Sequence, residues 1–209
     1  MARLNVNPTR MELGKLKARL KTATRGHKLL KDKTDEMIRR FSEIIREDKA
    51  LRDSVEQYVA ETLKQFSFAR TSVSKSDAEL VFSMPAVSAE VQCDVKTIMS
   101  VPVPSLTLSL IEKSGEYPYS PAFMTSEADG AVDMAENLLL KLIKLAELEK
   151  TTAMLAEEIE KGKRRVNALD YVLIPNLEET IKYITMKLEE NDRGSRVRLM
   201  KVKSMLENR

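Results

Sequence analysis

Few side chains of this 209-residue chain have types that could do chemistry, and they do not combine into a catalytic set. The only histidine, His27, could serve as a base or a metal ligand. It falls at an apolar-periodic position of a helix, which favours a hydrogen-bonded polar residue that sets helix register. The only cysteine, Cys93, alternates inward on a predicted hairpin and is expected to be a small core residue. One histidine and one cysteine exclude a structural zinc site.

Paired acids and a glycine-lysine segment also resemble chemical motifs. The acidic pairs Asp35-Glu36, Glu157-Glu158 and Glu189-Glu190 lie in helical patterns, where they are expected to be solvated faces. The segment Gly162–Arg165 lacks the second glycine and the hydroxyl of a phosphate-binding loop, and it lies inside a helical stripe. We therefore expect no catalytic residue, no cofactor and no metal in this chain.

The elements that carry these residues begin with a long helix. Apolar residues recur in steps of three and four from Leu13 to Tyr58, as in a helix packed along its length on a partner helix. Thr9 is a plausible N-cap with Glu12 three residues later, and the pattern holds to Phe68, although near its end it drifts toward Val59, Leu63 and Phe66. The expected line of contact with the partner helix, called the seam here, includes Leu16, Leu20, His27, Leu30, Phe41 and Ile44.

A second helix starts between Ser126 and Val132 and runs almost to the end of the chain. Within it, the steps from Val166 to Ile181 are longer than a strict heptad allows, which predicts a locally unwound supercoil. Pro175 lies in this stretch and should kink the helix, because it lacks an N–H and crowds the preceding turn. The expected seam residues of this helix include Val166, Leu169, Leu173, Leu177, Ile181 and Ile184.

The segment between the helices changes character. Alternating apolar side chains over Val91–Leu110, interrupted by a proline-bearing turn, predict a β-hairpin, and Ser114–Pro121 predicts a loop. Two long helices joined by a compact segment of about 60 residues can fold back antiparallel, whereas a parallel pair would need that segment to span the whole length of the helices. The periodicity alone leaves open whether the partner helix belongs to the same chain or to another. We therefore expect a mainly α fold, a long antiparallel two-helix coiled coil joined by a small cap that contains a β-hairpin. The expected divisions are an N-terminal helix over 1–68, a cap over 69–130 and a C-terminal helix over 131–209.

Composition and charge limit the function classes. Charged residues make up 32% of the chain and there is no tryptophan, which suits solvated helices with a narrow seam. Residues 1–40 carry twelve Lys or Arg against four acids, and residues 193–209 carry six against one. Antiparallel pairing would bring both basic segments to one end, which favours an acidic partner. The lone cysteine, the lack of a bilayer-length apolar run and the lack of a signal-peptide core predict a soluble intracellular protein.

Two segments resemble a known family. The run from Arg164 to Ile184, RRVNALDYVLIPNLEETIKYI, looks like the signature of the D subunit of V-type and archaeal-type rotary ATPases. The N-terminal residues Pro8–Arg10, Leu16–Leu20 and Arg25–Lys33 are similar to the same family. The resemblance covers both predicted helices, and it points to a bacterial V-type ATPase.

The resemblance implies a central-stalk rotor that couples ATP hydrolysis or synthesis to ion transport. Its partners would be the A and B subunits of the catalytic head, the small F subunit of the rotor and the funnel-shaped subunit above the membrane ring. It would lie on the cytoplasmic side of the membrane as a peripheral subunit. The head would hydrolyse ATP, so this chain would not be an enzyme. The residues expected to contact the head are Arg10, Lys15, Lys17, Arg19, Lys21, Arg196, Arg198, Lys201 and Lys203.

Two other classes stay open. A prefoldin-like chaperone also pairs two helices through β-hairpins, but it would expose apolar helix tips, whereas both ends of this chain are basic. A nucleic-acid-binding coiled coil would use the basic segments for phosphate contacts. Those segments lack the aromatic rings on which single strands stack, so we expect no nucleic acid. The transported ion would be H⁺ or Na⁺. The hairpin is either a simple cap that joins the helices or a docking element.

Overall fold

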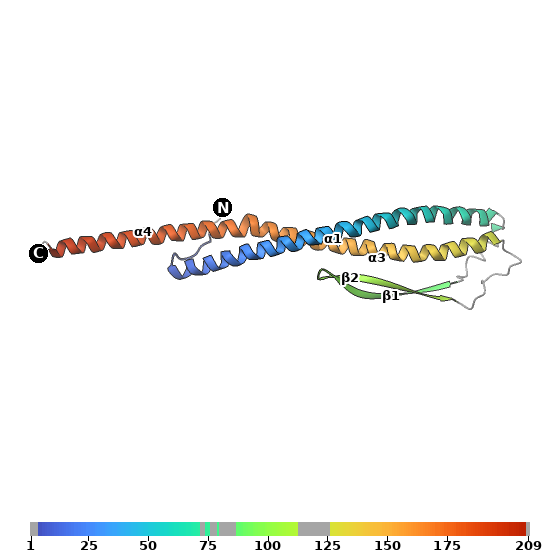
Figure 1. Cartoon of the computed structure of the whole chain (residues 1–209), viewed down its shortest axis with the longest axis horizontal. Coiled ribbons are helices and arrows are strands. Elements are labelled where there is room, and N and C mark those ends of the chain that lie inside the picture. The colour runs from blue at the N-terminus through green and yellow to red at the C-terminus, as the bar shows by residue number, and fades with distance from the viewer. Residues whose placement is uncertain (1–3, 72–73, 76–78, 80–86, 113–125, 208–209) are drawn as a thin grey trace. The chain divides into compact units, whose positions relative to one another are not determined.

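The structure is a computed structural model that describes residues 4–71, 74–75, 79, 87–112 and 126–207 (Figure 1). The predicted loop Ser114–Pro121 lies outside the described residues. The elements in chain order are α1 (Arg10–Thr71), β1 (Val87–Ile98), β2 (Val101–Glu112), α3 (Ser126–Ala168), the π-helix η1 (Leu169–Leu173) and α4 (Ile174–Glu207). The predicted fold class, two long helical stretches with a hairpin between them in the chain, is confirmed. Within the described part of the chain, no helix combines the length and apolarity needed to cross a bilayer.

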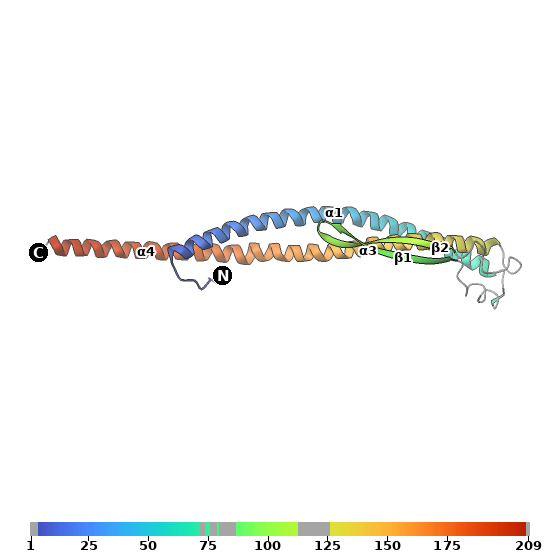
Figure 2. The same cartoon turned by 90° about the horizontal axis from the view of Figure 1, so that it is seen from below.

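The first helix begins as its sequence predicts. The Glu12 N–H donates to Oγ1 of Thr9 at 3.2 Å, and the Leu13 N–H donates to the Thr9 carbonyl at 3.0 Å. Thr9 therefore supplies an acceptor to a first-turn amide that has no partner within the helix. The residues before the cap turn back along α4, where the Leu4 N–H donates to Oγ1 of Thr180 at 3.2 Å (Figure 2).

The chain divides into two compact units, and each is described by itself. The first unit contains residues 1–36 and 159–209. Contacts across it pair Arg10 with Asp192 and His27 with Asp170, so rising numbers in α1 meet falling numbers in the C-terminal helices. The two helical stretches of this unit are therefore antiparallel. Its core contains Leu16, Leu177 and Ile184, packed against Leu13, Leu20, Ala23, Leu173, Ile181 and Leu188.

The first unit also contains the π-helix. The Ile174 N–H donates to the Leu169 carbonyl five residues back, and Pro175 follows at once. Proline cannot donate to a carbonyl of the preceding turn and its ring crowds that turn, so a wider turn relieves the crowding. The one extra residue of this turn accounts for the long four-residue steps around Leu173. We interpret those steps as the mark of a π-turn, where the sequence analysis expected a change of supercoil.

The second unit contains residues 37–158. Arg52 pairs with Glu149, and Nζ of Lys141 lies 3.6 Å from the centre of the Tyr58 ring, so α1 and α3 are antiparallel here as well. The buried residues of this part of α1 are Met37, Val55, Thr62 and Ala69. The predicted drift of the stripe is wrong at Leu63 and Phe66, whose side chains are 61% and 36% exposed. Thr62 and Ala69 follow Val55 at seven-residue intervals and are buried. These small side chains, rather than Leu63 and Phe66, therefore occupy the seam.

The hairpin of the second unit pairs β1 with β2 antiparallel, with Ile98 opposite Val101. Its turn is Met99-Ser100, and both residues have positive φ, 51° and 72°. Positive φ at both central residues defines a type I′ turn, whose twist matches that of the flanking strands. The prediction of a turn at the prolines is therefore wrong. Pro102 and Pro104 lie inside β2 and pair with Thr97 and Val95.

The two-residue turn changes which side chains share a face. Paired residues of an antiparallel ladder lie on the same face, so Val101 and Val103 lie opposite the face of Val91, Cys93 and Val95. Val101 and Val103 are buried, whereas Val91 and Val95 are 46% and 74% exposed. Cys93 is exposed too, so its prediction as a core residue was wrong. The apolar alternation was predicted to keep one face from Val91 to Val103. Because of the two-residue turn, the apolar residues before the turn and those after it lie on opposite faces of the hairpin.

Candidate functional site

The residues whose types could do chemistry belong to different units of the chain. His27 is half-buried in the first unit, with Nε2 3.9 Å from Oδ1 of Asp170 in η1. Cys93 lies on the exposed face of the hairpin. The described residues contain no group of three or more His, Cys, Asp or Glu that could hold a metal ion.

The predicted seam residues all lie in partly or fully buried positions. Leu16, Leu177 and Ile184 have at most 5% of their surface exposed. The other members are half-buried: Leu20, His27, Leu30, Phe41, Ile44, Val166, Leu169, Leu173 and Ile181. Pro175, the predicted kink position, is half-buried directly after the π-turn.

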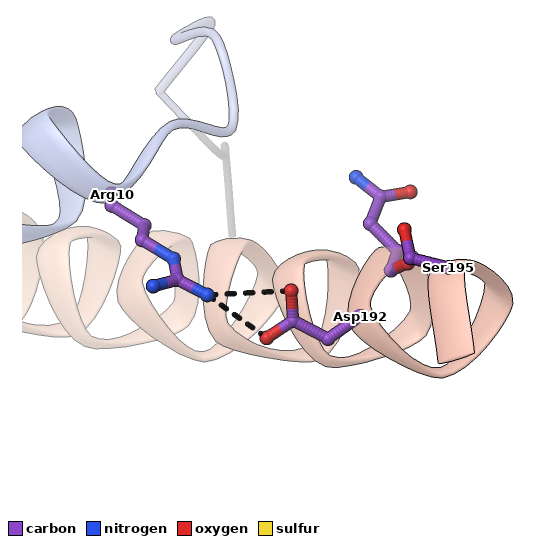
Figure 3. A network of polar contacts seen from close by, with 4 residues as sticks. Arg10, Asp192 and Ser195 are labelled. Carbon is purple, nitrogen blue, oxygen red and sulfur yellow. Dashed lines mark hydrogen bonds and ion pairs between the residues drawn. The ribbon is translucent and has the colours of Figure 1, made fainter. Parts of the chain in front are cut away.

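Three of the predicted head-contact residues form ion pairs within the chain. The Arg10 guanidinium donates to both carboxylate oxygens of Asp192, at 3.3 and 3.1 Å (Figure 3). Lys15 pairs with Glu12 at 2.8 Å, and Lys203 pairs with Glu207 at 3.5 Å. These pairs are largely exposed, so each contributes at most about 1 kcal/mol to stability. Their weakness leaves the cations available to a partner.

The other predicted contact residues are exposed and have no acidic partner among the residues the structure describes. They are Lys17, Arg19, Lys21, Arg196, Arg198 and Lys201. The Arg10–Asp192 pair places the start of α1 beside residue 192 of α4, so the predicted contact residues that begin α1 and those that follow Asp192 belong to the same end of the first unit.

The last fifteen helical residues, 193–207, continue α4 beyond that pair by about 22 Å (Figure 2). This segment, called the α4 extension here, carries large apolar side chains that are each more than half exposed. They are Val197, Leu199, Met200, Val202, Met205 and Leu206. The basic charge of this segment is predictable from its sequence, whereas the exposure of its apolar side chains is not, because it depends on where α1 begins.

The structure adds two contacts that the sequence analysis missed. A Cβ built on Gly162 would lie 2.6 Å from Cγ2 of Thr34, so the glycine permits a close approach of α1 and α3. The Lys187 ammonium donates to Glu190 at 2.8 Å, which lowers the pKa of that carboxyl and raises the pKa of Lys187. The glycine gave a signal, since it lies inside a helix where alanine would be more stable. A close helix contact is a common reason for such a residue.

A shallow apolar depression lies beside the π-turn. It is lined by Leu30, Arg165, Ala168, Leu169, Val172 and Leu173. Tyr171 and Val172, next to it, are 72% and 58% exposed. The wide turn therefore presents apolar side chains to solvent on one side of the first unit.

The comparisons with known proteins agree with the sequence resemblance. The family model described as the ATP synthase D subunit matches residues 12–204. The chain is 51% identical to the V-type ATP synthase D subunit of Clostridium novyi (strain NT), covering 99% of this chain and 97% of the relative. It is 49% identical to the proteins of the same name from Thermoanaerobacter sp. (strain X514) and Streptococcus pyogenes serotype M3. Those matches cover 99% and 98% of this chain, and 99% and 100% of the relatives. These matches favour the central-stalk prediction over the chaperone and nucleic-acid alternatives, and the chain belongs to the family of ATP synthase D subunits.

Proposed function

We propose that this chain is the rotating central stalk of a V-type ATPase, with the α4 extension enclosed by the catalytic head. One observation carries the proposal: the extension exposes apolar side chains on opposite sides of one helix. At 100° per residue, Leu199, Val202 and Leu206 fall within about 60° of one another. Val197 and Met205 fall on the other side of the helix.

An apolar surface on all sides favours enclosure. A helix that packs on one partner helix needs a single apolar stripe, whereas a helix that is apolar all round is buried by its surroundings. A hexameric head of A and B subunits would supply a socket around the extension. The interspersed cations Arg196, Arg198 and Lys201 would then meet acidic groups on the socket wall.

The coupling mechanism rests on asymmetry of the stalk. The π-turn before Pro175 exposes Tyr171 and Val172 on one side of the first unit. A stalk whose sides differ makes different contacts with three otherwise equal catalytic interfaces. It can therefore stabilise different nucleotide states at the three interfaces at the same time. When hydrolysis changes the state of one interface, the preferred orientation of the stalk changes and the stalk turns.

The remaining partners follow from the same proposal. The chain would act with the small F subunit of the rotor and with the funnel-shaped subunit above the membrane ring. The assembly would lie on the cytoplasmic side of the membrane, with this chain as a peripheral and non-catalytic subunit. The domain division expected over 1–68, 69–130 and 131–209 would then separate the two stalk helices from the connecting cap.

A binding experiment tests the enclosed helix. The full chain carries an affinity tag and is mixed with purified A and B head subunits, and the dissociation constant is measured. Val197→Asp and Leu199→Asp alter opposite sides of the extension, and each should weaken binding about tenfold or more. Each substitution would bury an unpaired charge in the socket.

The matched control is Leu63→Asp, which replaces an equally exposed leucine of the second unit. It should leave head binding unchanged. Normal binding by both extension variants would contradict the enclosed helix. Weakening by only one of them would indicate a partner that covers a single face.

A further inference from the structure

The two outer edges of the β-hairpin, neither of which pairs with a further strand among the residues that the structure describes, differ in their backbone donors. Ile98 and Val101 flank a two-residue turn, so they exchange both backbone hydrogen bonds, and the bonded pairs then alternate along the ladder. Pro102 and Pro104 occupy the intervening positions, where the backbone N–H would point away from β1. The outer edge of β2 therefore lacks two consecutive outward donors, and prolines of this kind block the addition of another strand.

The outer edge of β1 has no such block. The outward amides there belong to Val91, Cys93, Val95 and Thr97, none of which is proline. All residues from 89 to 97 are exposed. On β2, by contrast, Val101 and Val103 are buried. A strand with exposed, unpaired outward amides is a template for an added strand.

The side chains of β1 indicate what kind of strand would be added. Its polar face carries Glu90, Gln92, Asp94 and Lys96, with a net negative charge. Its other face carries Val91, Cys93 and Val95, all exposed. Cross-strand neighbours prefer opposite charges on one face and apolar or β-branched pairs on the other. The complement is a strand in which Lys or Arg alternates with apolar residues.

We propose that the outer edge of β1, over residues 89–97, binds an extended strand of another ATPase subunit in which basic and apolar residues alternate. The proposal rests on the proposed function for the identity of the complex and on the hairpin itself for the surface. It assigns the hairpin a docking role, which the sequence analysis left open. A second copy of this chain is the competing occupant: antiparallel β1–β1 pairing centred on Gln92 would place Glu90 opposite Asp94, whereas pairing centred on Cys93 would place Glu90 opposite Lys96. The oligomeric state of the isolated chain distinguishes this occupant from a strand of another subunit.

Hydrogen exchange tests the added strand. The complex is purified through a tag on this chain, and residue-level exchange is compared between the complex and the isolated chain. The outward amides of Cys93 and Val95 should exchange at least about tenfold more slowly in the complex, because a new strand would bond them. The amides of Asp94 and Lys96 already bond within the hairpin and should be protected in both samples. Unchanged rates at Cys93 and Val95 in the assembled complex would overturn the proposal.

Two variant pairs make the test specific. Cys93 pairs with Leu106, so Cys93→Pro removes an outward donor from β1, and Leu106→Pro removes its counterpart from β2. Neither substitution deletes a hydrogen bond between the strands. Cys93→Pro should abolish the extra protection of Val95 in the complex, and Leu106→Pro should leave it intact. The protection of Asp94 shows that the hairpin remains folded in each variant.

The second variant pair tests the charge of the partner. Glu90→Lys with Asp94→Lys reverses the polar face of β1, and Ser109→Lys with Ser105→Lys adds the same charges to the paired positions of β2. Only the β1 variant should lose protection at Cys93. Equal loss of protection in both variants, or dimerisation of the isolated chain through β1, would overturn the assignment to a basic strand of another subunit.

If the chain assembles normally and its β1 amides remain unprotected, this inference fails and the proposed function stands. Failure to bind any head subunit would overturn both.

Discussion

Gly162 of α3 and Thr34 of α1 approach so closely that a Cβ on the glycine would lie 2.6 Å from Cγ2 of the threonine. The threonine cannot easily turn away, because its hydroxyl donates to the Lys31 carbonyl at 2.8 Å and Thr34 is 7% exposed. This contact fixes the spacing of the two helices where α3 approaches the π-turn. The close packing of the two helices in the first unit therefore requires glycine at position 162, in addition to the apolar side chains of the seam.

Gly162→Ala should destabilise the isolated chain by about 1–3 kcal/mol, because the added methyl group forces the helices apart. The measurement is the free energy of unfolding in denaturant. Gly26→Ala is the matched control, since nothing lies within 4 Å of a Cβ built there. The control should stabilise the chain by about 0.5–1 kcal/mol through helix propensity. Equal stability of the two variants would show that the close contact does not exist.

Substitution of a seam leucine should lower the stability of the fold, whereas substitution of a leucine of the α4 extension should weaken head binding. Leu177 is fully buried and Leu199 is 69% exposed. Leu177→Ala should cost about 2–5 kcal/mol of folding free energy, because it leaves a cavity. Leu199→Ala should change stability by less than about 0.5 kcal/mol and should weaken head binding. Thermal unfolding and head titration separate the two effects, and a stable Leu177→Ala chain would argue against the assigned core.

Acid should weaken the contact between Lys187 and Glu190. The lysine lowers the pKa of the Glu190 carboxyl in the folded chain. The stabilisation is therefore present above the ordinary glutamate range and is lost as the pH falls through the lowered pKa. Lys187→Met should return the Glu190 titration, followed by NMR of the carboxyl carbon, to its usual range. Lys182→Met is the control, and a shift equal to that of Lys187→Met would rule out the specific contact.

Asp48 is a polar residue of the second unit whose Oδ1 is buried without a hydrogen-bond partner among the described residues. Asp48→Leu should stabilise the chain by about 1 kcal/mol, because it removes a desolvated carboxylate oxygen. The exposed Asp53 provides the control, and Asp53→Leu should have little effect. Destabilisation by Asp48→Leu in chemical unfolding would mean that the carboxylate makes a favourable interaction.

Local signals predicted the helices well. The Thr9 cap depends on residues three and four positions away, and the apolar period requires only a partner of the same kind. The turn of the hairpin was harder, because Met99-Ser100 contains none of the residues that favour positive φ, while Pro102 and Pro104 drew attention to the wrong place. The role of Gly162 depends on which residue faces it across the pair. No pattern within its own helix contains that information.

Observation of rotation tests the central claim most directly. The A and B head subunits are fixed to a surface, and a bead is attached to this chain through Ser67→Cys in a Cys93→Ser background. Ser67 is exposed on α1, so a cysteine there is accessible to the linker of the bead. The account predicts that ATP drives the bead in one direction with three pauses per turn. ATP hydrolysis at full rate with a stationary, firmly bound bead would contradict the rotating-stalk function.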